Sequence, residues 1–233
     1  MIYVMSDIHG LYDQYKQMLD KINFKDNDTL YVLGDVVDRG EQPMKVLHDM
    51  SMRANIYPIM GNHDYIAAIL LERLSVEITE NNYATHIDDN IMELLAAWFQ
   101  DGGKPTLDDY ERLPLDEREY ILEYLKEFAP YETVTVNGQR YILTHAGLHE
   151  SADLRNLDSF DLKDYVTATI DYSKIYFKDA ILVTGHTPTF HLGEEWRSKV
   201  FRANNHLAID TGGVFGENFA CVCLDTGEEF YVP

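Results

Sequence analysis

Potential metal ligands follow five short apolar runs of the chain, and each group of ligands lies beside a glycine. The five groups are Asp7-Ile8-His9-Gly10, Gly34-Asp35-Val36-Val37-Asp38-Arg39-Gly40, Gly61-Asn62-His63-Asp64, His145-Ala146-Gly147 and Gly185-His186-Thr187-Pro188. Any one of them alone is typical of an ordinary turn, but five in one chain indicate a shared site. Carboxylates, one amide and three imidazoles, without thiolates, suit manganese, iron, zinc, nickel or cobalt better than calcium.

The number of candidate ligands predicts more than one metal ion. About six ligands exceed what a single catalytic ion with an open coordination position requires. They fit two divalent ions roughly 3.5–4 Å apart that share one carboxylate. We therefore expect a two-metal centre, with manganese as the first candidate for its ions.

The runs that precede the five groups have the length and the β-branched or aromatic composition of strands. They are Ile2–Met5, Leu30–Leu33, Ile56–Met60, Tyr141–Leu143 and Ile181–Val183. Binding sites in open α/β sheets form at the carboxyl ends of the strands, so we expect the five turns to converge there. The glycines allow the sharp turns and the close backbone approach that such a site needs.

Helical patterns separate the first three strands, and hairpin signals follow later in the chain. The expected helices are Leu11–Ile22, Met44–Met52 and Tyr65–Leu74. This alternation of strand and helix is typical of an α/β core. The later strands are expected at Thr133–Val136 and Arg140–Leu143, joined by the turn Asn137-Gly138, and at His206–Asp210, Ala220–Leu224 and Phe230–Val232. They favour a mixed sheet or two packed sheets over a purely parallel one.

The net charge disfavours one group of partners. The chain of 233 residues has 40 acidic against 19 basic residues, a net charge of −21. Such a charge repels phosphate backbones and anionic lipids, and no basic patch offsets it, so we expect neither a nucleic-acid nor a membrane partner.

The N-terminus lacks a secretory signal and no apolar run approaches the ~18 residues of a membrane span, so a cytoplasmic protein is expected. Cys221 and Cys223 are too close in sequence for an ordinary disulfide and are interpreted as reduced, buried thiols.

About half of the net charge lies in a quarter of the chain. Residues 77–132 hold 15 acids and 4 bases, a net charge of −11. Helices are expected at Asp88–Phe99 and Pro114–Phe128, so we predict a single domain over residues 1–233 with a helical, acidic insert or cap at about 75–130. Two interpretations remain open: an ordinary solvated helical face, or a cap beside the cleft that favours substrates with basic residues flanking the phosphate.

The five ligand groups resemble, in order and spacing, the signature set of the calcineurin-like metallophosphoesterases. The branch they resemble is that of the bacterial PPP-type serine/threonine protein phosphatases, to which the stretch from Ile209 through Asp210-Thr211-Gly212-Gly213 to Gly216 is also similar. The resemblance covers about residues 1–74 and 141–216. It implies the calcineurin-like phosphoesterase fold: α/β (α+β), with two packed mixed β-sheets flanked by helices and the metal site at the C-terminal ends of strands.

The resemblance also implies a role for each residue of the site. Asp7, His9 and His186 would hold one ion, Asn62 and His145 would hold the second, and Asp35 would bridge both. A hydroxide bridging the ions would attack phosphorus directly, while Arg39 binds the phosphate oxygens. His63 would protonate the leaving group, held in the right tautomer by Asp38. Outside this context, Arg39 could equally form a surface ion pair.

Three functions are weighed. The first is a dinuclear-metal phosphomonoesterase that hydrolyses phosphoserine and phosphothreonine in proteins. The second is a diadenosine-tetraphosphate-type hydrolase, or another phosphoesterase acting on a phosphorylated small molecule. Asp38 favours the first, because the resemblance implies that the tetraphosphate hydrolases generally lack an acid there. The third, an inactive metal-binding scaffold, is disfavoured because the expected ligands and the Asp38–His63 pair are intact.

The second phosphate-binding arginine usual in the protein phosphatases has an uncertain counterpart in Arg155.

Overall fold

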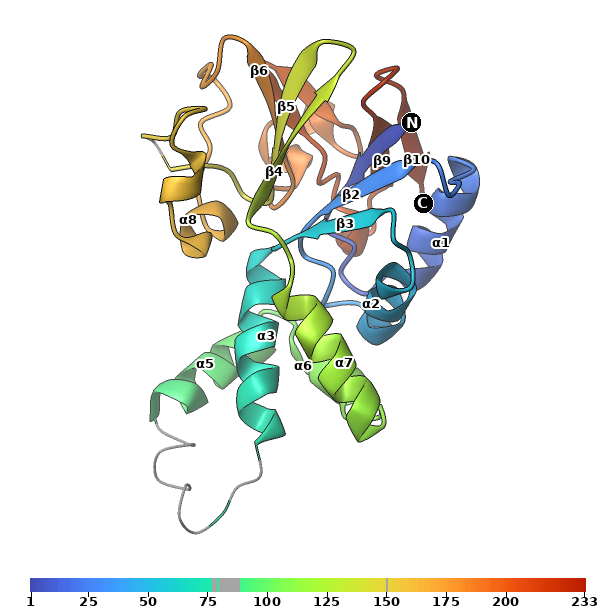
Figure 1. The fold of residues 1–233 in the computed structure, drawn as a ribbon, viewed down its shortest axis with the longest axis vertical. Coiled ribbons are helices and arrows are strands. Elements are labelled where there is room, and N and C mark those ends of the chain that lie inside the picture. The colour runs from blue at the N-terminus through green and yellow to red at the C-terminus, as the bar shows by residue number, and fades with distance from the viewer. Residues whose placement is uncertain (77–78, 80–88, 150) are drawn as a thin grey trace.

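Two five-stranded mixed sheets form the centre of the computed structural model, which describes residues 1–76, 79, 89–149 and 151–233 (Figure 1). The first sheet has the order β10-β9-β1-β2-β3. Its strands are β1 (Ile2–Met5), β2 (Thr29–Leu33), β3 (Ile56–Ile59), β9 (Phe219–Cys223) and β10 (Glu229–Val232). The second sheet has the order β4-β5-β6-β8-β7. Its strands are β4 (Tyr131–Val136), β5 (Gln139–Thr144), β6 (Ala180–Thr184), β7 (Phe201–Ala203) and β8 (His206–Ala208).

The strands that precede the ligand groups run parallel within each sheet. In the first sheet, β1 pairs parallel with β2 and β2 with β3. In the second, β5 pairs parallel with β6 and β6 with β8, whereas β4 and β7 pair antiparallel at the edges. Parallel pairing brings the carboxyl ends of neighbouring strands to the same sheet edge, as expected for a shared site.

The two sheets pack face to face through an apolar layer, because the pleat directs alternate side chains of each strand to this layer. Val4 and Leu33 of the first sheet lie in the same buried cluster as Leu143, Val183 and Leu207 of the second. The two mixed sheets flanked by helices therefore confirm the predicted fold class.

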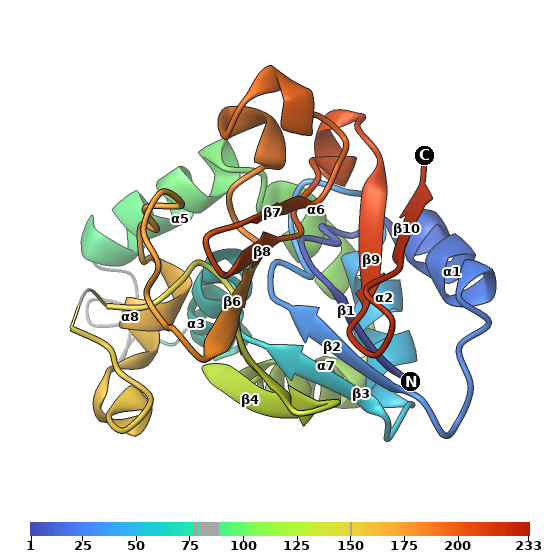
Figure 2. The ribbon, with the colours of Figure 1, turned by 90° about the horizontal axis from the view of Figure 1, so that it is seen from above.

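Helices cover the outer faces of the sheets (Figures 1 and 2). The helices beside the first sheet are α1 (Tyr12–Lys21), α2 (Pro43–Ser51), α3 (Asn62–Ser75) and α7 (Leu115–Lys126). Buried side chains such as Met18, Leu47 and Leu71 pack from these helices into one cluster with Met5 and Val32. On the second sheet, α8 (Leu162–Val166) contributes Tyr165 to a smaller cluster. The short 3₁₀ turns are Leu157–Ser159, Thr189–His191, Glu194–Trp196 and Gly213–Phe215.

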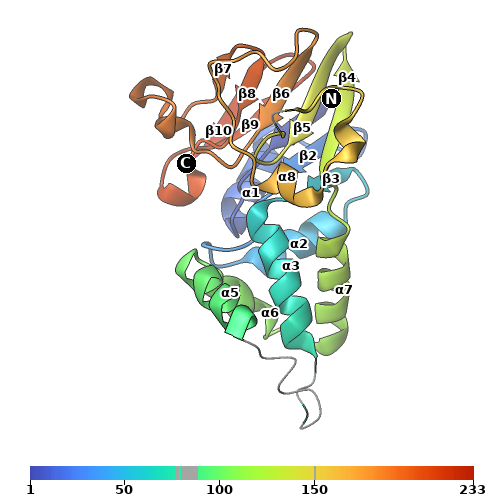
Figure 3. The same cartoon turned by 90° about the vertical axis from the view of Figure 1, so that its left-hand side faces the viewer.

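The segment expected to be a helical insert contributes three described helices. They are α5 (Asp89–Gln100), α6 (Lys104–Tyr110) and α7 (Leu115–Lys126). They gather beside α3 at the end of the molecule away from the second sheet (Figure 3). The predicted helices at Asp88–Phe99 and Pro114–Phe128 are thus present, whereas α6 has only two turns and was not predicted. Residues 77–78 and 80–88, also part of the expected acidic insert, lie outside the described residues.

Two further expectations concern the cysteines and the membrane. Cys221 and Cys223 are free and buried in β9, as predicted, and burial raises the pKa of the Cys221 thiol. Within the described part of the chain, no helix combines the length and the apolar composition that crossing a bilayer requires.

The apolar layer between the sheets generates a stability prediction. Leu207 is 1% exposed there, so Leu207→Ala is expected to lower the free energy of unfolding by about 2–5 kcal/mol through lost burial and a residual cavity. Leu115, 79% exposed at the start of α7, offers the matched control, and Leu115→Ala is expected to change it by less than about 0.5 kcal/mol. Urea titrations followed by circular dichroism measure both, and equal effects would contradict this account of the core.

Candidate active site

The ligand-bearing turns share an unusual backbone conformation. Six residues other than glycine have φ between 45° and 69° there: Asp7, His9, Asp35, Asp38, Arg39 and His186. Left-handed conformations cost free energy for residues with a Cβ, and they persist only where surrounding contacts determine them. Hydrogen bonds between turns provide such contacts: the Asp7 amide donates to the Gly34 carbonyl at 3.0 Å, and the His9 amide to the Asp35 carbonyl at 2.8 Å.

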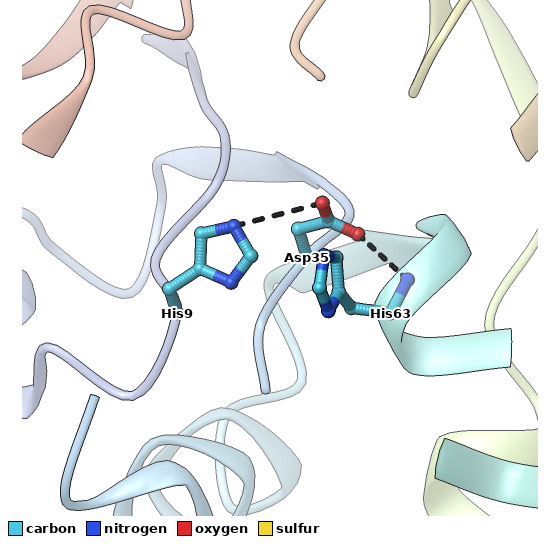
Figure 4. A group of neighbouring side chains, drawn as sticks. All are labelled: His9, Asp35 and His63. Carbon is cyan, nitrogen blue, oxygen red and sulfur yellow. Dashed lines mark hydrogen bonds and ion pairs between the residues drawn. The ribbon is translucent and has the colours of Figure 1, made fainter. Parts of the chain in front are cut away.

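Asp35 lies at the centre of the converging side chains. Its Oδ2 is 3.6 Å from His9 Nε2, and its Oδ1 accepts a hydrogen bond from the His63 amide at 3.0 Å (Figure 4). On the other side, Oδ1 is 3.3 Å from His145 Nε2. Two sets of donor atoms that could hold a metal ion therefore share this carboxylate: His9, Asp35 and His63 in one, and Asp35, His145 and His186 in the other.

The remaining predicted ligands border the same cluster. Asn62 Oδ1 is 2.9 Å from His145 Nε2, and His186 Nδ1 is 3.2 Å from that nitrogen. The Asp7 carboxylate accepts the His186 amide at 3.0 Å, which connects β1 with the turn after β6. All six predicted ligands are thus brought together, although the geometric sets include His63 and divide the histidines differently from the predicted ligand sets.

Backbone carbonyls orient two of the imidazoles that are candidate metal ligands. His9 Nδ1 donates to the Val37 carbonyl at 2.9 Å, and His145 Nδ1 donates to the Leu33 carbonyl at 2.7 Å. In both rings, Nε2 is left facing Asp35. This is the usual arrangement of a metal-binding histidine, in which a hydrogen bond at one nitrogen fixes the ring that coordinates through the other.

Glycines make room for the ligand atoms. A Cβ at Gly61 would lie 2.2 Å from Asp35 Oδ1, and a Cβ at Gly185 would lie 2.3 Å from Asp7 Oδ2. The absence of side chains at these two positions is therefore what allows the carboxylates to reach the centre. Together with the donor chemistry, this close packing fits a site for divalent ions.

Burial and mutual charges shift the protonation of the ligands. Burial lowers the pKa of His9 to about 3, and burial with the charge of His145 lowers that of His186 to about 4. Burial also raises the pKa of Asp7 to about 6, with a further contribution from the charge of Asp35. At His145, burial opposes the charged form, but the Asp35 carboxylate outweighs it and raises the pKa to about 10. The pKa of Asp35 is correspondingly lowered, since the neighbouring histidines outweigh its burial.

The predicted proton donor lies at the edge of this cluster. His63 Nδ1 donates to Asp38 Oδ2 at 2.7 Å, and both side chains are buried. Burial disfavours the cation of His63, but the hydrogen bond to Asp38 and the charge of Asp35 outweigh it, so its pKa is raised. The Asp38–His63 pair is thus formed as predicted.

Arg39 lies over the same edge, and its contacts are not limited to an ion pair at the surface. Its Nη1 donates to His9 Nε2 at 2.7 Å and its Nη2 to His63 Nε2 at 2.8 Å. Nη2 also donates to Asp101 Oδ1 at 3.1 Å. The planar guanidinium therefore faces the ligand cluster, where a phosphate could replace these contacts. Arg155, the uncertain second arginine, instead pairs with Asp153 at 2.7 Å and is largely exposed.

Several residues of the site carried no recognisable pattern in the sequence. Trp98 and Thr106 of the insert bond the Asp38 carboxylate, and Asp101 contacts Arg39. A cavity of about 220 Å³ beside His63 is lined by Trp98 and Asp101 together with Asn62, Ile66, Leu94 and Ala97. Because the insert has no ligand motif, only proximity in the fold identifies these residues.

Two buried acids support the turns. Asp64 Oδ1 accepts the amides of Val36 and Val37, and its Oδ2 accepts the Gly61 amide at 3.1 Å, so it caps α3 and anchors the turn after β2. Burial raises its pKa to about 7. Asp210 accepts the Gly212 amide at 2.9 Å, and burial and the nearby Asp7 charge raise its pKa.

The chain belongs to the calcineurin-like phosphoesterase family, whose model matches residues 1–213. A symmetrical bis(5'-nucleosyl)-tetraphosphatase from Hamiltonella defensa is 29% identical over 153 residues, which cover 65% of this chain and 46% of that enzyme. This chain matches less than half of the length of the first curated relatives.

Solved structures share the fold across the whole chain. A structure with a provisional assignment as a diadenosine tetraphosphatase has a TM-score of 0.66 at 18% identity, covering 100% of this chain and 92% of its own. A protein serine/threonine phosphatase from Saccharomyces cerevisiae has a TM-score of 0.58 at 12% identity, covering 100% of this chain and 80% of its own. At these identities the likeness shows the fold alone.

The raised pKa of His145 predicts that metal binding releases protons. Near pH 7.5 its imidazole is protonated in the metal-free protein, because the pKa is about 10, and it must become neutral to coordinate an ion. Calorimetric titration with Mn²⁺ in buffers of different ionisation enthalpy is expected to give buffer-dependent heats, and the release is expected to be smaller in His145→Asn. Identical heats in every buffer would contradict the protonated state of His145.

Proposed function

We propose that this protein is a two-metal phosphoesterase that hydrolyses dinucleoside polyphosphates. Asp7, His9 and His186 would hold one divalent ion, Asn62 and His145 the other, and Asp35 would bridge them. The observation that carries this assignment is the shared Asp35 carboxylate, which faces histidine Nε2 atoms on both sides. When bound, such ions lower the pKa of a coordinated water and offset the charge of phosphate oxygens.

The remaining site residues have roles that follow from their positions. The two terminal nitrogens of Arg39 donate hydrogen bonds to His9 and His63. Its planar guanidinium therefore faces the place where phosphate oxygens would lie. His63 directs Nε2 to the same place, while Nδ1 is held by Asp38. We therefore assign phosphate binding to Arg39 and protonation of the departing oxygen to His63.

The substrate class rests on the relatives. The first curated matches are all named symmetrical bis(5'-nucleosyl)-tetraphosphatases. None of these first curated matches is named as a phosphoprotein phosphatase. The proposal therefore replaces the first expectation from the sequence with its small-molecule alternative, and manganese stays the first candidate metal.

One observation favours phosphomonoesters as a second candidate substrate class. An alkoxide is a poorer leaving group than a phosphate, so an ester depends more strongly on a general acid than an anhydride does. The buried Asp38–His63 pair, 2.7 Å apart, is suited to supply that acid. Phosphoserine and phosphothreonine peptides consequently stay in the substrate panel.

A substrate panel tests the proposal. The purified protein with Mn²⁺ is expected to cleave diadenosine tetraphosphate to two molecules of ADP, with kcat/KM at least about tenfold above that for a phosphoserine peptide, a difference of about 1.4 kcal/mol in transition-state stabilisation. Product analysis by anion-exchange chromatography distinguishes symmetrical from asymmetrical cleavage. Faster hydrolysis of the phosphopeptide would contradict the first substrate class and support the second.

The bridging role has its own test. Asp35→Asn removes the charge shared by both sets of ligands, so it is expected to lose bound Mn²⁺ and to lower turnover by at least about a hundredfold. Metal content by mass spectrometry of the same sample shows whether both effects occur together. Asp153→Asn, an exposed acid paired with Arg155, is the matched control. An Asp35→Asn protein that retains two ions and full turnover would refute the bridge.

A further inference from the structure

We propose that Trp98 and Thr106, both from the insert, are positioning residues for the proton-donating His63 and act through Asp38. The inference rests on the role proposed for His63 and adds two residues to it. Neither residue contacts a predicted metal ligand in the hydrogen bonds described above. Their common partner is the carboxylate of Asp38.

Thr106 holds one end of this carboxylate. Its Oγ1 donates to Asp38 Oδ1 at 2.6 Å and accepts the backbone amide of the same aspartate at 2.8 Å. One hydroxyl thus fixes both the backbone and the side chain of Asp38. A serine would keep both bonds, whereas a valine of similar shape would lose both.

Trp98 holds the other end. Its Nε1 donates to Asp38 Oδ2 at 2.8 Å, and Oδ2 is also the oxygen that faces His63 Nδ1 at 2.7 Å. The tryptophan therefore determines the direction in which this oxygen meets the imidazole. With each oxygen held by its own donor, the carboxylate plane is fixed relative to the His63 ring.

Burial makes these donors hard to replace. Asp38 and Thr106 are 0% exposed and Trp98 is 3% exposed, so water has no ready access to the carboxylate. A buried charge that loses a hydrogen-bond donor has no water to replace it. The free-energy cost is therefore typically larger than that of losing a hydrogen bond at an exposed site. Removing either donor is therefore expected to shift the carboxylate or weaken its bond to His63.

The backbone of the insert supports the same turn. Asp38 and Arg39 are consecutive residues in the left-handed region, with φ of 69° and 67°. The Asp38 amide is held by Thr106, and the Arg39 amide donates to the Gly102 carbonyl at 2.8 Å. Two strained residues of the site thus depend on the Gly102 turn and on Thr106 at the start of α6.

The two glycines between these helices explain how the segment comes so close. A Cβ at Gly102 would lie 2.7 Å from Arg39 Cγ, and a Cβ at Gly103 would lie 2.3 Å from Trp98 Cδ2. Gly102 also has φ of 100°, a conformation that disfavours other residues. The close contact between this segment and Arg39 therefore depends on the absence of side chains at both glycines.

The test uses variants that separate positioning from folding. Thr106→Val and Trp98→Phe each remove one donor, and Thr106→Ser restores the hydroxyl. Thr135→Val on the exposed face of β4 and Trp196→Phe, at the only other tryptophan of the chain, are the matched controls. Thermal denaturation of each metal-loaded variant reports on folding.

Aryl phosphates of graded leaving-group ability give the kinetic readout. Thr106→Val and Trp98→Phe are expected to lose about tenfold more kcat on phenyl phosphate than on 4-nitrophenyl phosphate, whose leaving group needs little protonation. Thr106→Ser and both controls are expected to keep the wild-type ratio. Equal losses on both esters would overturn the proposal, because a merely structural role lowers turnover regardless of the leaving group.

A spectroscopic readout is independent of turnover. In the metal-free protein the His63 Nδ1 proton, assigned by its absence in His63→Asn, is expected to resonate far downfield and to exchange slowly with water. Thr106→Val and Trp98→Phe are expected to move it upfield and accelerate its exchange, while Thr106→Ser retains it. An unchanged resonance in both variants would overturn the proposal. Neither readout depends on cleavage of a dinucleoside tetraphosphate, so failure of the proposed substrate class remains distinguishable.

Discussion

The burial of the Asp35 carboxylate is the constraint on which the rest of the site depends. The residue is 2% exposed, so its charge must be met by neighbouring donors and cationic groups rather than by bulk water. The His63 amide and the imidazoles of His9 and His145 come from three different strand ends to meet it. Both sheets must therefore hold their carboxyl ends at one place, which the parallel pairing within each sheet and the apolar layer between them achieve.

The ligand turns converge on one carboxylate only with strained backbone conformations. Six residues other than glycine adopt left-handed conformations in the ligand turns, and Gly61 and Gly185 stand where a Cβ would strike a carboxylate oxygen. The strained turns are held by hydrogen bonds to other segments, such as those that Asp64 of α3 accepts from Val36 and Val37. The conformation of these turns therefore depends on contacts with other segments as well as on their own residues.

The insert has a closer relation to the chemistry than its acidic composition indicates. Its described helices supply Trp98 and Thr106 to the Asp38 carboxylate, and Asp101 to Arg39. His63, the proposed general acid, and Arg39, the proposed phosphate-binding group, thus lie between the ligand turns of the core and a segment without ligand motifs. Members of one fold family can differ in such segments, which offers a physical route to different leaving-group preferences on the same metal site.

Local sequence determined the strands except β7, most of the helices and the six candidate ligands, because apolar periodicity, turn glycines and ligand chemistry are properties of short segments. The resemblance of its motifs to those of the family implied the pairing of Asp38 with His63. The short helix α6 and the contacts of Trp98 and Thr106 were not predictable, because residues 60 or more positions from Asp38 meet it only when the insert packs on the core. The sequence therefore determined which groups are available for the chemistry, whereas the tertiary structure decided which of them touch, because hydrogen bonds between distant segments form only once burial has excluded water from both.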